Sequence, residues 1–225
     1  MTKIAIMQPT FLPWLGYFSL IKKVDKFIFL DSVQFNKRSW QQRNKIKNNT
    51  KSMYLTVPVL SKNKFDQKIS ETKIDRNSKY IENHLKSLKL NYGSSIYFDI
   101  YFNGLKKIYD NDFASISELN INLIKHCSNL LNIETEFFKT SDFNFENSKT
   151  KLLVNICKYF KANTYIAPEG SNDYLIENNF NENHISLEYQ NYMHPKYNQN
   201  NEVFISHLSI IDLFFSEGPK SKNYI

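Results

Sequence analysis

Two short apolar runs near the N-terminus, separated by a helix-length segment, constrain the fold most. Residues 3–8 read Lys-Ile-Ala-Ile-Met-Gln and stop at Pro9, and residues 27–31 read Phe-Ile-Phe-Leu-Asp. Each run has the composition of a buried strand, and the connection is too long for a hairpin. The apolar residues between the runs recur near helical spacing: Leu15, Phe18, Leu20, Ile21 and Val24. The first 31 residues therefore predict a strand–helix–strand unit in a parallel sheet.

A parallel sheet also predicts where a ligand binds. In open α/β sheets, ligands lie beyond the carboxyl ends of the strands. This rule places residues 8–17 and residues 31–44, which follow the two apolar runs, at a common rim. We therefore expect the functional residues of the N-terminal third to come together there.

The remainder of the chain predicts further α/β structure without internal repeats. Strands are expected at 53–60, where Pro58 argues against a central position, and at 164–167. Polar loops are expected at 139–149 and 196–202. Helices are expected at 78–92, 97–109, 115–132, 150–160 and from Ser209 to Phe215. The prediction is one domain over residues 1–225, with a parallel-sheet Rossmann-like core and a helical middle portion, of which about 78–135 is a candidate subdomain.

Composition excludes several protein classes. The chain has 225 residues, 41% of them hydrophobic, which suffices for a sizeable core. No run approaches the roughly 20 apolar residues of a membrane span, and the N-terminus lacks the apolar core of a signal peptide. We therefore expect a cytoplasmic protein. Cys127 and Cys157 lie in apolar segments without metal-ligand spacing, so we expect buried thiols and assign no metal.

The charge pattern indicates anion recognition. Most of the 29 basic residues are lysines spread along the chain, and the net charge is +7. Two of the three arginines, Arg38 and Arg43, fall within six residues of each other. Guanidinium groups present fixed donors that match phosphate, so we expect Lys37, Arg38 and Arg43 to bind phosphates. The lysine excess alone is weak support for nucleic-acid binding, and no DNA partner is expected.

The first rim segment, residues 8–17, turns through two prolines into the expected helix. Free backbone N–H groups at such a turn suit an anion or a nucleotide, although a rigid turn packed by Phe11 and Trp14 is the alternative. The segment is similar to the Phe-x-Pro-x-His-x-Gly-His turn of nucleotidyltransferases. Leu15 and Tyr17 stand where that family has histidines, so the similarity implies a nucleotidyltransferase-like fold for the first unit and not its chemistry.

Three ionisable side chains are candidates for proton transfer. Asp31, at a strand's carboxyl end, can accept a proton or hold an amine; the alternative is that it caps the turn and pairs with Arg43. His194 precedes Pro195, which restricts its backbone, so the imidazole can act as a base or serve a structural role. Asp212 lies on a mostly apolar helix and must be paired if buried. A His194–Asp212 pair, which would orient the imidazole, is our hypothesis. Residues 169–174 are either a further rim loop or a surface turn.

Motifs along nearly the whole chain identify a family. The sequence resembles the WbqC-like family in segments 7–18, 29–35, 37–40, 43–44, 55–59, 165–174, 194–199 and 208–212. The resemblance implies a role in bacterial surface polysaccharide synthesis, in O-antigen or capsule loci. Some of these loci encode amino sugars that carry an aminoacyl group.

The resemblance and the residues together predict an N-acyl- or N-aminoacyltransferase acting on the amine of a nucleotide-linked amino sugar. The donor is an aminoacyl-tRNA, for example of the glycyl type, or a thioester. The five isolated glycines do not form the loop typical of acetyl-coenzyme A enzymes, and hexapeptide repeats are absent, which favours the aminoacyl donor. No cofactor is assigned. The alternatives are a non-catalytic nucleotide-sugar or RNA binding protein, and a glycosyltransferase-like or nucleotidyltransferase-like enzyme.

The predicted site follows from this reading. His194, Asp31 and Asp212 are the expected catalytic residues. The expected substrate-binding residues are Gln8, Trp14, Tyr17, Gln34, Lys37, Arg38, Trp40, Arg43, Asn44, Tyr197 and Gln199.

Overall fold

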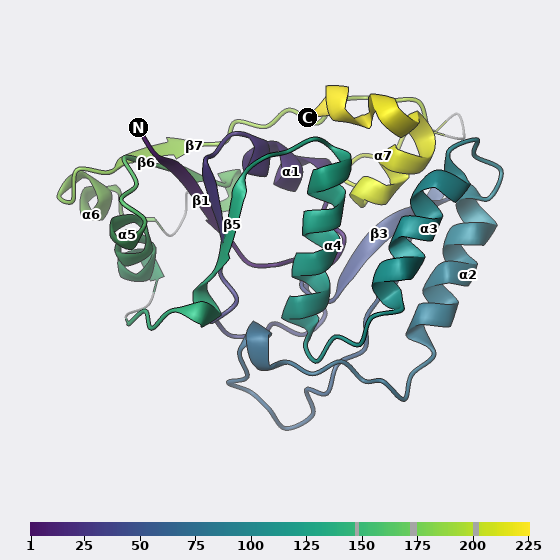
Figure 1. Cartoon of the computed structure of the whole chain (residues 1–225), viewed down its shortest axis with the longest axis horizontal. Coiled ribbons are helices and arrows are strands. Elements are labelled where there is room, and N and C mark those ends of the chain that lie inside the picture. Colours follow the sequence, from purple (N-terminus) through teal and green to yellow (C-terminus); the bar gives the residue numbers. More distant parts are fainter. Residues whose placement is uncertain (147–148, 172–174, 200–202) are drawn as a thin grey trace.

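A five-stranded parallel sheet forms the centre of the α/β fold (Figure 1). The computed structural model describes residues 1–146, 149–171, 175–199 and 203–225. The spatial order of the strands is β5-β2-β1-β6-β7. Their bounds are β1 Lys3–Met7, β2 Lys26–Phe29, β5 Glu136–Lys139, β6 Thr164–Ala167 and β7 Ser186–Tyr189.

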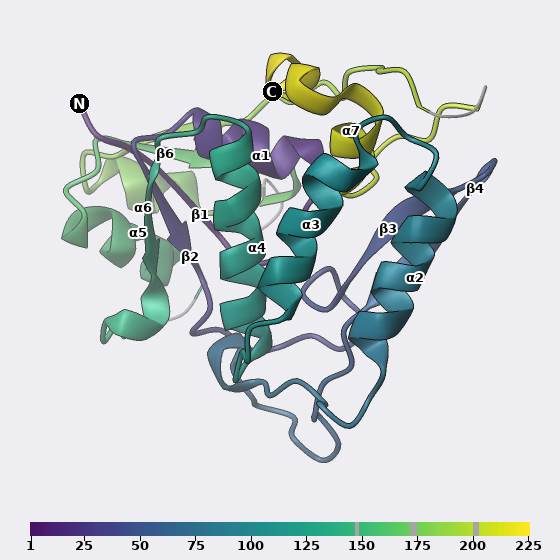
Figure 2. The ribbon, with the colours of Figure 1, turned by 45° about the vertical axis from the view of Figure 1, so that its right-hand side comes forward.

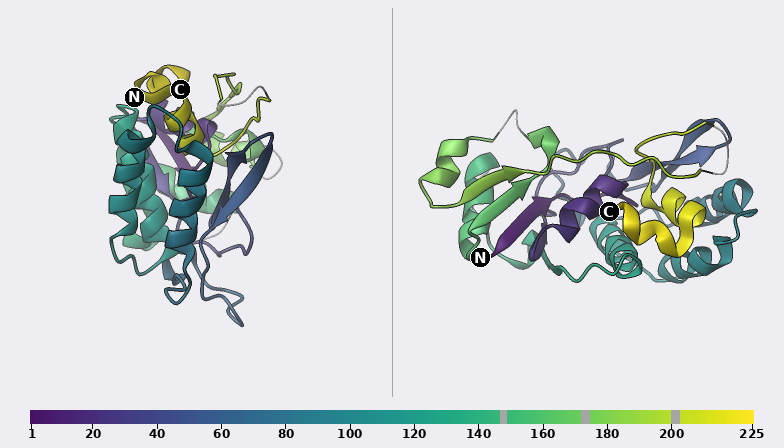
Figure 3. Two further views of the ribbon diagram at one scale, coloured as in Figure 1. Left: turned by 90° about the vertical axis from the view of Figure 1, so that its right-hand side faces the viewer. Right: turned by 90° about the horizontal axis from the view of Figure 1, so that it is seen from above.

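The predicted strand–helix–strand unit is confirmed. β1 and β2 pair in parallel through Ile4↔Lys26 to Met7↔Phe29, and α1 (Leu15–Lys22) connects them. Side-chain alternation along these strands divides the core into two clusters. Ala5, Phe27 and Phe29 belong to the cluster under α1 and α4 (Ile116–Leu130), whereas Ile4, Ile6 and Ile28 pack with α5 (Lys149–Tyr159) and α6 (Glu177–Asn181). Helices therefore cover both faces of the sheet (Figure 3).

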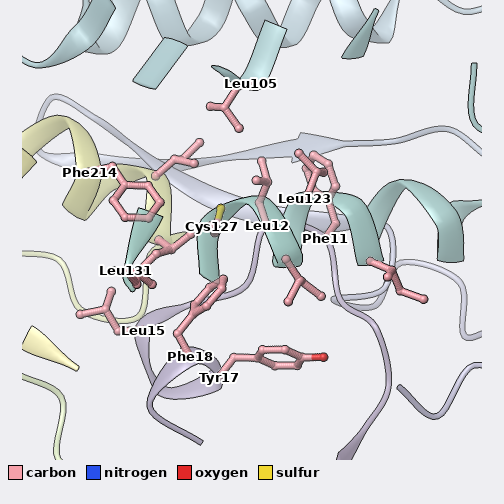
Figure 4. Packing of buried hydrophobic residues seen from close by; sticks show 14 of the residues in the cluster. Phe11, Leu12, Leu15, Tyr17, Phe18, Leu105, Leu123, Cys127, Leu131 and Phe214 are labelled. Carbon is pink, nitrogen blue, oxygen red and sulfur yellow. The ribbon is translucent and has the colours of Figure 1, made fainter. Parts of the chain in front are cut away.

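The helical middle portion lies beyond α4, away from the sheet (Figure 2). It contains α2 (Tyr80–Tyr92) and α3 (Phe98–Tyr109), close to their predicted bounds. α4 begins at a Ser115 cap whose hydroxyl accepts a hydrogen bond from the Glu118 N–H. Apolar residues of α1, α3 and α4 pack against α7 (Ile210–Glu217) in one cluster (Figure 4).

The structure differs from the prediction at the strand expected over residues 53–60. β3 (Arg43–Asn48) and β4 (Lys51–Thr56) form a separate antiparallel ribbon. The strand expected at 53–60 therefore starts earlier and ends before Pro58, which cannot donate to a ladder. β3 continues from the second predicted rim segment, whose polar composition gave no strand signal.

The strand order reverses at β1. β2 pairs with one side of β1, and β6 pairs with the other. The connections from β1 and from β6 therefore lead to opposite faces of the sheet and leave a crevice at their carboxyl ends. This crevice is the expected ligand position in such a sheet.

Both cysteines are buried, in the two different core clusters. Burial raises the pKa of both thiols, that of Cys157 to about 12, so they are unreactive at neutral pH. Across the described ranges, the structure contains no helix with the length and apolar character needed to span a bilayer.

Candidate functional site

The rim predicted from the sequence is present. The loops after β1 and β2 are joined by a backbone hydrogen bond from Phe11 N–H to Trp40 O (2.8 Å) and by Gln41 Nε2, which donates to Gln8 Oε1 (2.7 Å). The two segments thus form one surface beyond the carboxyl ends of their strands.

One residue of the first loop adopts an unusual backbone conformation. Leu12 has φ 42°, in the left-handed region that a branched side chain rarely occupies. Asn44 Nδ2 donates to both Phe11 O (3.2 Å) and Leu12 O (2.7 Å), which holds this conformation. Asn44 therefore shapes the rim. Such strain is concentrated at functional sites.

Two cavities meet at the end of β1. The switch-point cavity, of about 730 Å³, lies at the β1–β6 crevice, and the aromatic cavity, of about 430 Å³, lies toward the hairpin and the C-terminal segment. Met7 and Thr10 line both cavities. Groups bound in the two cavities would therefore be close to one another across these two residues.

The switch-point cavity has mostly apolar walls. Its apolar lining comes from β1, the loop after β2, α5 and the residue before α6, and includes Ile6, Leu30, Val33, Leu152, Leu153 and Ile176. Gln8 and Lys149 add polar groups, and Lys149 is the first residue of α5. Such walls suit an apolar group, and an anion is favoured at a helix N-terminus that carries a lysine.

The aromatic cavity contains several residues predicted to bind substrate. Trp14, Tyr17, Trp40 and Asn44 line it, together with Lys45, Ser52 and the segment 205–207. Tyr17 is buried and donates its hydroxyl to Gln8 O (3.0 Å), so burial and this bond fix the ring in the wall. The cavity therefore offers aromatic faces beside a small set of polar groups.

A stacked pair of imidazoles borders this cavity. The rings of His194 and His207 have centroids 4.6 Å apart and an interplanar angle of 20°. The Trp14 ring is 5.0 Å from His207 and 6.3 Å from His194. His207 lines the cavity, is exposed and has φ 58°. His194 is half-buried behind it, and His194 Nε2 accepts a hydrogen bond from the His207 N–H (3.4 Å).

The environment keeps His194 uncharged. Burial, with a smaller contribution from the neighbouring His207, lowers the pKa of His194 to about 4. The imidazole is therefore neutral at pH 7. A neutral imidazole can accept a proton, but one with this pKa is a weak base.

Several buried polar atoms near the pair lack partners among the described residues. They are Tyr192 Oη, His194 Nδ1 and Ser209 Oγ. Tyr192 contacts the Trp14 ring edge-on at 5.1 Å, and Ser209 forms a β-bridge with Trp14. Buried groups in native proteins usually have a partner, so this set of atoms is suited to hydrogen bonds with a ligand or water.

Asp212 does not pair with His194, contrary to our hypothesis. Its carboxylate accepts hydrogen bonds from Tyr92 Oη (2.7 Å), Tyr197 Oη (2.7 Å) and Gln199 Nε2 (3.0 Å). Burial raises the pKa of Asp212, and these donors oppose the shift. Lys47 Nζ donates to Gln199 Oε1 (3.2 Å) in the same network. Asp212, Tyr197 and Gln199 thus hold the C-terminal segment in place, because Gln199 also bonds both backbone groups of Ile205 beside the cavity.

Asp31 is likewise enclosed by the protein. It is 1% exposed, and its oxygens accept hydrogen bonds from Ser117 Oγ (3.0 Å), Ser141 N (2.8 Å) and Ser141 Oγ (2.8 Å). These bonds join the end of β2 to the start of α4 and to the turn after β5. The contacts of Asp31 therefore agree with the alternative that it stabilises the turn after its strand, but its hydrogen bonds within the described residues include those from Ser117 and Ser141 and none from Arg43.

The predicted basic group is not gathered around a cavity. Lys37 and Arg38 are exposed, with Lys37 Nζ 5.8 Å from the Phe65 ring, and the Arg43 guanidinium lies 4.4 Å from the Tyr54 ring. Gln34 Nε2 donates to Phe65 O (2.6 Å). These side chains lie along the loop and hairpin outside the two cavities. Of the loop predicted at 169–174, Glu169 accepts from the Tyr192 N–H, and residues 172–174 lie outside the described residues.

Sequence reasoning missed His207 and Tyr192, and also Lys45, Ser52 and Lys149 of the cavity linings. His207 directly precedes the 208–212 motif, and that adjacency was the available signal. Within the described part of the chain, no group of three or more His, Cys, Asp or Glu side chains is arranged to hold a metal ion.

The fold and site define an α/β protein with two adjoining cavities at the carboxyl edge of a parallel sheet. The model of the WbqC-like protein family matches residues 8–224, and the chain belongs to that family. An uncharacterized protein of Mycobacterium tuberculosis, Rv1507c, is 34% identical over 227 residues, which cover 100% of this chain and 98% of that protein. No solved structure matches the chain.

Proposed function

We propose that the protein is an N-acyl- or N-aminoacyltransferase that acts on the amine of a nucleotide-linked amino sugar in the synthesis of bacterial surface polysaccharides. The observation that carries this proposal is the adjacency of the two cavities across Met7 and Thr10, with an imidazole pair beside one of them. A transferase must bring two substrates together. The two cavities suit the nucleotide and the sugar of the acceptor, and the mouth of the aromatic cavity is left for the acyl donor.

The nucleotide belongs in the switch-point cavity. The apolar walls suit a base, and Lys149 at the start of α5 suits a diphosphate. The strand order around β1 supports the finer description of the sheet as Rossmann-like, with a nucleotidyltransferase-like first unit. The amino sugar then extends past Met7 and Thr10 into the aromatic cavity.

The reaction joins the sugar nitrogen to the acyl carbon. The neutral amine attacks the carbonyl carbon of an ester or thioester, and the C–O or C–S bond to the donor breaks. His207 accepts the proton that the nitrogen loses and returns one to the leaving oxygen or sulfur. His194 supports the His207 backbone. We assign stabilisation of the oxyanion to Lys45 and Ser52, which line the same cavity.

Mass spectrometry tests the reaction. The protein is incubated with a panel of UDP- and dTDP-linked amino sugars and with charged tRNA, coenzyme A thioesters or no donor. A mass gain of one acyl or aminoacyl group that requires a donor supports the proposal. Binding of a nucleotide sugar by calorimetry without any transfer would instead support the non-catalytic binding protein.

His207→Asn is the matched variant, because asparagine tolerates the left-handed backbone found at His207. We expect turnover to fall by about 10²- to 10⁴-fold while nucleotide-sugar binding remains. His184→Asn, another histidine with positive φ (56°), is the control and should keep full turnover. Equal turnover of both variants and the parent would remove His207 from the reaction.

A further inference from the structure

The net positive charge of the protein comes from one continuous segment. Residues 32–65 contain eight of the 29 lysines and arginines and none of the 22 aspartates and glutamates. The rest of the chain, with 21 basic and 22 acidic residues, is close to neutral. Lysines occur throughout the sequence, but the excess that produces the net charge lies in the second rim loop and the β3–β4 hairpin.

The same segment exposes aromatic rings next to its cations. Tyr54 on β4 pairs with Lys45 on β3, and Lys45 Nζ is 5.4 Å from the Tyr54 ring centroid. The Arg43 guanidinium lies 4.4 Å from that ring, and the Trp40 ring is 6.3 Å away. Trp40 is 50% exposed and Tyr54 42% exposed. We call Trp40, Arg43, Lys45 and Tyr54 the hairpin platform.

The hairpin platform is continuous with the aromatic cavity. Trp40 and Lys45 belong to the platform and also line that cavity. On the rim loop, Lys37 Nζ lies 5.8 Å from the ring of Phe65, which is 77% exposed. The combination of cations and exposed rings thus extends beyond the cavity mouth along the molecular surface.

We infer that the hairpin platform and the second rim loop, residues 31–44, bind the single-stranded end of an RNA. Aromatic side chains on which bases stack, within a positively charged surface, are the usual means of holding single strands. The exposed cations suit the phosphates of a polymer, including Lys37, Arg38, Lys51, Lys62 and Lys64. A small nucleotide needs far fewer charges, and in a duplex the stacked bases would not be available to Trp40 and Tyr54.

This inference rests on the proposed function and names its donor. The RNA carries the acyl group as an ester on its terminal ribose, and the platform places that end at the mouth of the aromatic cavity. On transfer, the bond between the acyl carbon and the ribose oxygen breaks, the amide bond to the sugar nitrogen forms, and the ribose oxygen takes up a proton.

Fluorescence anisotropy with a labelled ten-nucleotide single-stranded RNA tests the binding surface on the full chain. Tyr54→Ala should weaken binding by about 5- to 150-fold, the effect of about 1 to 3 kcal/mol for one stacked base. Tyr54→Phe keeps the ring and should bind within about twofold of the parent. Because Tyr54 is exposed, neither change threatens the fold.

The salt dependence provides a second readout. Lys37→Ala combined with Arg38→Ala should reduce the slope of log Kd against log salt by about 1.4, the effect of two lost phosphate contacts on a single strand. Lys106→Ala combined with Lys107→Ala, on the exposed surface of α3, is the matched control and should leave the slope unchanged.

Three results would overturn the inference: no saturable binding of the RNA, equal weakening by the α3 control, or competition by duplex RNA as strong as that by single-stranded RNA. Transfer from a coenzyme A thioester by a protein that binds no RNA would overturn the RNA donor and leave the proposed function standing. RNA binding that depends on Tyr54, without transfer from any donor, would support the binding surface and overturn the transferase.

Discussion

Two polar clusters on the C-terminal segment differ in how fully their hydrogen bonds are made. Around Asp212, the hydroxyls of Tyr92 and Tyr197 and the amide of Gln199 all donate to one buried carboxylate. Around Trp14, the described structure leaves Tyr192 Oη and His194 Nδ1 buried without partners, and the neighbouring Trp14 and His207 line the aromatic cavity. Complete hydrogen bonding stabilises a fold, whereas a buried polar atom without a protein partner can still form a hydrogen bond with a ligand or water.

The largest expected effect is a loss of stability when the hydrogen bonds around Asp212 are removed. Asp212→Ala removes the acceptor for three buried donors, and we expect unfolding to become easier by about 3 to 5 kcal/mol. Urea denaturation of parent and variant measures this loss. Asp212→Asn should also destabilise the fold without moving either limb of a pH–rate profile, because Asp212 does not contact His194. A moved limb would restore our hypothesis of a His194–Asp212 pair.

Two histidines with similarly lowered pKa values give the next comparison. Burial lowers the pKa of His84 to about 4, as it does for His194, but both nitrogens of His84 are bonded, to Tyr109 Oη (3.1 Å) and Thr56 O (3.0 Å). The unfolded state, with a histidine pKa of about 6.5, binds more protons between pH 6.5 and 4, so stability falls as the pH is lowered through this range. For His84 the loss is at most about 3 kcal/mol.

His84→Gln should flatten the fall in melting temperature between pH 6.5 and 4. His194→Gln should flatten it less, because His194 is only half-buried and solvent screens its charge. An equal effect of the two variants would show that His194 is as enclosed as His84 and would weaken its place beside an open site.

Two tyrosines sharpen the contrast further. Tyr197→Phe removes a hydroxyl that donates to the Asp212 carboxylate at 2.7 Å, and we expect a loss of about 1.5 to 3 kcal/mol in denaturation. Tyr192→Phe removes a buried hydroxyl with no partner among the described residues and should change stability by less than about 0.5 kcal/mol. If Tyr192→Phe is as destabilising as Tyr197→Phe, the Tyr192 hydroxyl has a hydrogen-bond partner in the folded protein. It then does not belong with the unpartnered atoms around Trp14.

The smallest expected effects come from two helix caps. Ser115→Ala removes the hydroxyl that caps α4 and should cost about 1 kcal/mol. Ser209 precedes α7 without a side-chain cap bond, so Ser209→Ala should cost less than about 0.5 kcal/mol. Thermal melts of the two variants side by side measure the difference. A larger loss of stability for Ser209→Ala than for Ser115→Ala would contradict the assignment of Ser209 Oγ to the unpartnered atoms around Trp14.

The sequence predicted the fold best where local patterns were strong. β1, β2 and β6 are continuous apolar runs, and α2 to α4 carry regular apolar faces, so their positions followed from periodicity. β5 and β7 were missed because charged and polar residues interrupt their short apolar runs, one reading Glu-Phe-Phe-Lys and the other Ser-Leu-Glu-Tyr. Their pairing with a neighbouring strand, which no local pattern reports, defines them.

For the candidate site, the sequence predicted the rim but not which side chains contact one another there. Trp14, Tyr17, Trp40 and Asn44 line the aromatic cavity as expected of binding residues. The sequence indicated Asp31 as an acid at the end of a strand and Asp212 as an acid on an apolar helix, but their hydrogen-bond donors come from distant segments that a sequence does not place. His207 was overlooked because its importance comes from its stacking on His194 and Trp14.

The central claim, that substrate binds at the imidazole pair, is tested most directly by imidazole NMR. The ¹H–¹⁵N signals of the five histidines are followed while the UDP- and dTDP-linked amino sugars are titrated into the protein. The account predicts that signals of His194 and His207 shift with a saturable response while those of His84 stay fixed. A bound sugar nucleotide that leaves both His194 and His207 unchanged would contradict it.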